Sequence, residues 1–163
     1  MGSTGKVSPS LTLADLQGQW RHTSFLLDAD SLIPSAPPGT DAQSMARVWA
    51  TGALELQAPA GGDTLTGELK FPNGIKLVIH VREAPGLFGE VGGFSIEGSG
   101  MVPNPAGGTS PLLYHLVGTL SPDWRKDGSD TLIVGAIRAA GYDPIAPTGT
   151  VGAFVLVRVP SAA

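Results

Sequence analysis

No cysteine occurs among the 163 residues of this chain. Disulfides, thiolate metal ligands, iron–sulfur clusters and a cysteine nucleophile are therefore excluded together. Charged residues are also scarce: Asp, Glu, Lys and Arg make up 15% of the sequence, and the formal net charge is −4. Because there is no surplus of Lys and Arg to neutralise phosphates, we expect no nucleic-acid partner.

Long apolar segments are missing as well. No run approaches the roughly 18 apolar residues that a membrane helix needs, and no basic amphipathic stretch indicates binding to a membrane surface. The first eight residues lack the apolar core of a signal peptide. We therefore expect a cytoplasmic protein with no membrane partner.

Glycine and proline, by contrast, are abundant, with 23 and 14 residues respectively. This composition suits many turns between short strands. The length is that of one domain with a real core. We expect residues 1–9 to be a flexible N-terminal segment and residues 10–160 to form a single domain.

Eight segments have the composition and alternation of β-strands. Asn73-Gly74 predicts a tight type I′ hairpin between two of them, and proline-rich residues 28–41 predict a long loop of the kind that can act as a lid. We expect connections at residues 86–93 and 103–111. The eight strand segments are residues 20–27, 48–56, 64–71, 75–82, 94–101, 112–120, 131–138 and 151–159.

No long amphipathic helix accompanies these segments, so the sequence predicts an all-β antiparallel meander. A meander of this length exposes two edges, and closure into a barrel removes them. We therefore predict an eight-stranded antiparallel up-and-down barrel. Eight strands enclose either packed side chains or one small ligand.

A short helical turn precedes the first strand. Thr12 with Asp15 three residues later resembles a capping box, Gly18 permits a sharp turn of the backbone, and Trp20 is a large apolar plug with one N–H donor. Gly18-x-Trp20, the turn before it and Arg158 in the last strand together resemble the calycin superfamily of lipocalin-like and avidin-like barrels. The resemblance implies that Trp20 closes one end of the barrel and that Arg158 stacks on its ring as a structural cation–π pair.

Alternation predicts a polar patch inside the barrel. Trp20, His22 and Ser24 share one face of the first strand, and Tyr114 lies on the apolar face of the sixth. We predict that these four residues, with Arg138 at the open end or reaching inward to an anionic group, contact a ligand. For Arg138 the alternative is that its side chain extends from a strand end into water.

Two further tryptophans lie outside this predicted patch. Trp49 falls on the face opposite Ala50 and Leu54, and Trp124 falls in a charged turn. Either tryptophan could line the mouth of the barrel or mark a subunit contact, and homo-oligomerisation stays open.

Other kinds of site have little support. His22, His80 and His115 lie on three different strands, so no metal site is predicted. No G-x-S-x-G elbow indicates a hydrolytic triad. The stretch 106–108 lacks the Lys and the helix of a phosphate-binding loop, and we expect no cofactor. The strand glutamates Glu55, Glu68 and Glu97 are expected on the barrel exterior.

Three functions remain open. The first is a non-catalytic barrel that binds an apolar or aromatic small molecule, with His22, Ser24 and Tyr114 orienting it. The second is a cyclase or isomerase that uses the same pocket, with His22 or Tyr114 as the acid–base group. The third is recognition of a protein or glycan by the proline-rich loops. A His22→Ala change separates the first two, because only an enzyme would lose turnover.

Overall fold

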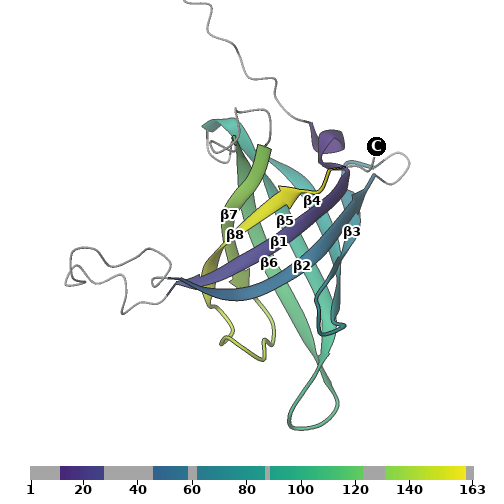
Figure 1. Cartoon of the computed structure of the whole chain (residues 1–163), viewed down its shortest axis with the longest axis vertical. Coiled ribbons are helices and arrows are strands. Elements are labelled where there is room, and N and C mark those ends of the chain that lie inside the picture. The colour runs from purple at the N-terminus through teal and green to yellow at the C-terminus, as the bar shows by residue number, and fades with distance from the viewer. Residues whose placement is uncertain (1–11, 28–45, 59–61, 87–88, 123–130, 161–163) are drawn as a thin grey trace, which may run out of the picture.

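The computed structural model describes residues 12–27, 46–58, 62–86, 89–122 and 131–160 (Figure 1). The predicted N-terminal segment, the proline-rich loop at 28–41 and Trp124 lie outside the described residues. None of the helices in the described part is long and apolar enough to cross a membrane.

One short 3-10 helix and eight strands make up the fold of the described residues. Each strand pairs antiparallel with the next, and β8 pairs with β1 to close the barrel. The predicted fold class and the positions of all eight strands are confirmed. The elements are η1 (Leu13–Leu16), β1 (Gly18–Leu27), β2 (Ala46–Gln57), β3 (Leu65–Lys70), β4 (Lys76–Gly86), β5 (Gly89–Pro103), β6 (Thr109–Pro122), β7 (Thr131–Ala139) and β8 (Val151–Arg158).

Two predicted connections are shorter than expected. The strand β4 continues to Gly86 and β5 begins at Gly89, so most of the predicted glycine-rich connection at 86–93 is strand. Similarly, β5 ends at Pro103 and β6 begins at Thr109. The prediction was wrong because glycine only weakens a strand, and pairing with neighbouring strands outweighs that local preference.

The hairpin between β3 and β4 is confirmed, but its predicted turn type is wrong. The Gly74 N–H donates to the Phe71 carbonyl at 3.0 Å, so the central residues of the turn are Pro72 and Asn73 rather than Asn73 and Gly74. Proline holds φ near −65°, which a type I′ turn does not allow. The positive φ falls instead on Gly74, at 86°.

A β-bulge changes the side-chain alternation of β2. Ser24 of β1 faces Ala50, but the next residue, Phe25, faces Val48, so Trp49 is the additional residue. Trp49 is consequently buried, at 4% exposure, and Val48 is exposed. The predicted outward position of Trp49 is therefore wrong, because strict alternation fails at a bulge.

Side chains fill most of the barrel. The predicted inward faces of β3 and β4 are confirmed, since Leu65, Leu69, Leu77 and Ile79 are buried. A Cβ added to Gly98 of β5 would lie 2.9 Å from Ile79 Cδ1. The glycine therefore accommodates a side chain of the neighbouring strand.

Candidate functional site at the open end of the barrel

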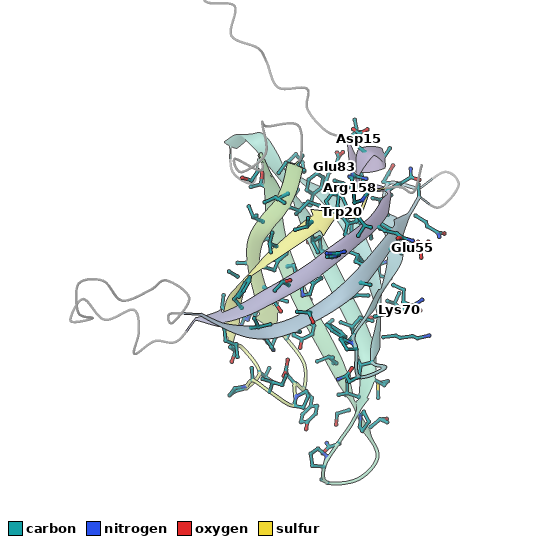
Figure 2. The ribbon with its side chains drawn as sticks, in the orientation of Figure 1. Asp15, Trp20, Glu55, Lys70, Glu83 and Arg158 are labelled. Carbon is teal, nitrogen blue, oxygen red and sulfur yellow. The ribbon has the colours of Figure 1, made fainter. Side chains whose placement is uncertain are left out.

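The end of the barrel that carries η1, here called the closed end, is sealed by Trp20 (Figure 2). Its ring is 1% exposed, and its Nε1–H donates to the Leu16 carbonyl at 2.9 Å. The Arg158 guanidinium lies 4.3 Å from the centre of the ring, and Arg158 Nη1 donates to the Gln17 carbonyl at 2.8 Å. The stacked pair expected from the resemblance is confirmed, and Trp20 lines neither cavity described below.

The helical turn beside this plug is held by its predicted cap. Asp15 Oδ2 accepts hydrogen bonds from the Thr12 N–H at 2.7 Å and the Thr12 hydroxyl at 2.9 Å. These bonds lower the pKa of Asp15, the backbone N–H contributing most. The closed end is thus stabilised by local hydrogen bonds and one cation.

Three of the predicted ligand contacts line one cavity inside the barrel. His22 and Ser24 of β1 and Tyr114 of β6 border a space of about 20 Å³, otherwise surrounded mainly by aliphatic side chains. A volume of about 10–15 Å³ on this measure holds one water molecule. This space, the inner cavity, therefore has room for a water-sized group and no more.

His22 is the principal polar group of the inner cavity. Its side chain is 3% exposed, and its ring stacks on Phe154 with a centroid separation of 6.3 Å and meets the edge of Phe71 at 6.5 Å. Burial lowers the pKa of His22 to about 4, so the imidazole is neutral at pH 7. A neutral imidazole offers one donor and one acceptor, and the contacts described for His22 are ring contacts with Phe154 and Phe71.

Ser24 lies two residues along the same face and is 1% exposed. Its hydroxyl donates to the Ala50 carbonyl at 3.4 Å, which is long for an O–H donor. The bond is weak, and the hydroxyl oxygen keeps acceptor capacity towards the cavity.

A larger space, the mouth cavity, opens at the opposite end of the barrel, here called the open end. Its volume is about 210 Å³. Phe71, Ala50 and Tyr114 also line the inner cavity, so the two spaces share a wall. The mouth cavity is lined by Trp49, Ala50, Thr51, Phe71, Pro72, Asn73, Ile75, Leu112, Tyr114, Asp143, Pro144 and Ile145.

Asp143, in the connection between β7 and β8, holds the wall of the mouth cavity together. Its Oδ2 accepts hydrogen bonds from Trp49 Nε1 at 3.1 Å and from the Tyr114 hydroxyl. Its Oδ1 accepts the backbone N–H groups of Ile145 at 2.6 Å and Ala146 at 2.9 Å. The carboxylate therefore joins β2, β6 and the β7–β8 connection across the open end.

Tyr114 belongs to this cluster rather than being a free polar group. Burial and the hydrogen bond to Asp143 raise the pKa of Tyr114, so the phenol stays protonated at neutral pH. Its ring meets Trp49 edge-on, with centroids 5.5 Å apart and an interplanar angle of 85°. The two aromatic rings form a corner of the mouth cavity.

Asp143 was not predicted as a site residue from the sequence. The available signal was an Asp-Pro pair in a Gly- and Pro-rich loop, where an Asp side chain commonly accepts from the backbone two or three residues ahead. The inward turn of Trp49 depends on a bulge that the sequence pattern did not reveal.

Arg138 lies on the outer surface. It is exposed, whereas its neighbours Ile137 and Ala139 are buried. The interpretation that Arg138 reaches inward is therefore wrong, because this position of β7 faces solvent. Arg138 lines neither cavity.

The remaining candidate residues also lie outside the barrel. His115 and Glu97 are exposed and lie 3.7 Å apart across β5 and β6, and His80 alternates with the buried Ile79 and Val81 of β4. Only His22 of the three histidines points inward. Within the part of the chain that the structure describes, no three His, Asp or Glu residues could hold a metal ion together.

Comparison with protein-family models, curated proteins and solved structures found no match to this chain.

Proposed function

We propose that this protein is a calycin-like barrel that binds an apolar or aromatic small molecule at its open end. The superfamily assignment is supported by the closed eight-stranded barrel, by η1, and by the Arg158 guanidinium stacked on the plug residue Trp20. The binding function is supported by the two cavities.

The mouth cavity has the size and lining of a small-molecule site. An engineered protein cavity of about 150 Å³ binds benzene, and the mouth cavity is larger, at about 210 Å³. Such sites are mostly apolar, with a few polar groups that fix the orientation of the ligand. Here the aromatic corner of Trp49 and Tyr114 supplies the apolar contact.

The observation that carries the proposal is the position of His22 and Ser24 in the inner cavity, which shares a wall with the mouth cavity. No fully buried side-chain nitrogen or oxygen of the described residues lacks a hydrogen-bond partner, so the polar atoms of His22 that make no such bond are those that face the cavity. A neutral imidazole can bond to a donor or acceptor there. His22 and Ser24 would therefore orient the ligand through a water molecule or a small polar group that enters the inner cavity.

The cyclase or isomerase alternative has less support. A pKa of about 4 makes His22 a weak base at neutral pH. The raised pKa of Tyr114, whose hydroxyl is already hydrogen-bonded to Asp143, makes the phenol a poor proton donor. Both groups are better suited to orienting a bound molecule than to moving its protons.

Native mass spectrometry of the freshly purified protein, compared with the denatured protein, tests whether a ligand is already bound. We expect a discrete additional mass that is lost on denaturation. The same spectrum gives the oligomeric state, which the single chain leaves open.

A titration followed by NMR tests the cavity itself, with indole, toluene and phenol as probes. Ala50→Phe fills the space between the two cavities, whereas Ala53→Phe adds the same group on the exposed face of the same strand. We expect the probes to shift the Trp49 indole signal in the native protein and in Ala53→Phe, but not in Ala50→Phe. If no probe binds the native protein, or if both variants bind equally well, the proposal is wrong.

A further inference from the structure

The residues that line the mouth cavity carry formal charge of one sign only, and that sign is negative. Among the residues that line the two cavities, Asp143 is the single one with a formal charge at pH 7, because His22 is neutral and no Lys or Arg is present. The side chain of Asp143 is 8% exposed. The proposed site therefore has one negative charge, largely shielded from water.

This negative charge is held by dipoles and lacks a cationic partner. The Asp143 oxygens accept hydrogen bonds from an indole N–H and two backbone N–H groups, all of them neutral donors. No Lys or Arg side chain of the described residues forms an ion pair with it. Four neutral donors stabilise the carboxylate but add no positive formal charge to the lining of the cavity.

The aromatic corner of Trp49 and Tyr114 offers a second attraction for a cation. Trp49 and Tyr114 both donate their polar hydrogen to Asp143, and hydrogen bonding to an anion polarises the donor group. Aromatic faces are negative and attract cations, most strongly where water is excluded. A cation in the mouth cavity would therefore interact favourably with both the rings and the carboxylate.

We propose that the ligand of the mouth cavity is an organic cation with an apolar body, such as an aryl or alkyl ammonium ion. This inference rests on the proposed function and deepens it by naming the class of ligand. Carboxylate and phosphate ligands are disfavoured, because a second negative charge would be placed close to Asp143 in a site of low dielectric constant. The apolar body of the cation would lie against the wall formed by Leu112 and Ile75.

Three probes of similar shape test the charge preference in the native protein. They are phenyltrimethylammonium, which is cationic, tert-butylbenzene, which is neutral, and benzoate, which is anionic. Affinities are measured by NMR titration of the Trp49 indole signal, assigned with Trp49→Phe. We expect phenyltrimethylammonium to bind about tenfold more tightly than tert-butylbenzene, with benzoate the weakest.

Two substitutions that each remove one negative charge then test whether the preference for the cationic probe depends on Asp143. Asp143→Asn removes the charge in the mouth cavity, and Asp63→Asn removes one from an exposed surface groove beside η1. We expect Asp143→Asn to weaken phenyltrimethylammonium about tenfold and tert-butylbenzene less than twofold. Asp63→Asn is expected to change neither affinity.

The outcomes separate this inference from the proposed function. If tert-butylbenzene or benzoate binds as tightly as the cation, the cavity binds small molecules but the cationic class is wrong. If none of the three binds, both the inference and the proposed function fail. Because the comparison of probes uses the native protein, it stands even if Asp143→Asn fails to fold.

Discussion

Each end of the barrel is built around one tryptophan, and the two tryptophans have opposite surroundings. At the closed end the Trp20 N–H donates to a carbonyl and the ring lies against the Arg158 guanidinium. At the open end the Trp49 N–H donates to the Asp143 carboxylate, and the ring borders a cavity of about 210 Å³. One ring has a cation from its own chain, and the other has an anion and an open space.

This difference shows that one residue type can form a closed seal at one end of a barrel and border an open cavity at the other. Both indoles are buried and both have a satisfied N–H. What differs is whether the chain itself supplies the group that covers the ring. At the closed end β8 supplies Arg158, whereas at the open end no described Lys or Arg lines the cavity.

The largest loss of stability should come from removing the Trp20 side chain, which seals the closed end. Trp20→Ala is expected to lower the free energy of unfolding by about 3–5 kcal/mol, because a fully enclosed large side chain leaves a cavity behind. Trp49→Ala is expected to cost less, since its ring already borders an open space. Urea denaturation of the two variants measures both losses. Equal losses would show that the two ends are packed alike.

The second largest expected effect is the pH dependence of stability that His22 causes. This residue lies between the two ends of the barrel. The native protein keeps His22 neutral down to its pKa of about 4, while the unfolded chain takes up a proton near the ordinary histidine pKa of about 6.5. As the pH falls below 6.5 the unfolded state therefore binds more protons, and stability decreases until the pH reaches about 4.

Between pH 7 and pH 5 this linkage amounts to about 2 kcal/mol. His22→Leu should lose that part of the pH dependence, while the contributions of the carboxyl groups remain. Chemical denaturation of both proteins at several pH values measures the difference. Parallel pH profiles would contradict a neutral buried imidazole.

The smallest effect should come from a conservative change at the closed end. Arg158→Lys keeps the positive charge but loses the planar group that stacks on Trp20 and bonds to the Gln17 carbonyl. We expect a loss of about 1 kcal/mol, because the Arg158 side chain is exposed. Thermal or urea denaturation gives the size of the loss. Binding of phenyltrimethylammonium at the open end should not change, and a change would mean that the two ends are coupled.

The closed end could be predicted from the sequence because its signals are local or independent of register. Thr12 and Asp15 are three residues apart, and Gly18-x-Trp20 follows directly. The strands were found from alternation, and inward residues such as His22, Ser24 and Tyr114 followed from the same pattern. None of these inferences requires knowledge of how distant segments meet.

The open end could be predicted only in part because it depends on contacts between distant segments. A bulge opposite Ser24 and Phe25 turns Trp49 inward, and alternation within β2 gives no sign of it. Asp143 is 94 residues from Trp49 in the sequence. Their contact follows from barrel closure, and the sequence pattern of either segment alone does not contain it.

The pairing of β1 with β8 also has a consequence for biosynthesis. The other seven strand pairs join neighbours along the chain, whereas the hydrogen bond from Arg158 to Gln17 spans 141 residues. During translation, hairpins can form as they emerge, but the edge of β1 has no partner until β8 has left the ribosome. The strand β8, the last of the barrel to be made, thus completes both the sheet and the seal over Trp20, and slow synthesis would prolong the time in which an open edge is exposed to other chains.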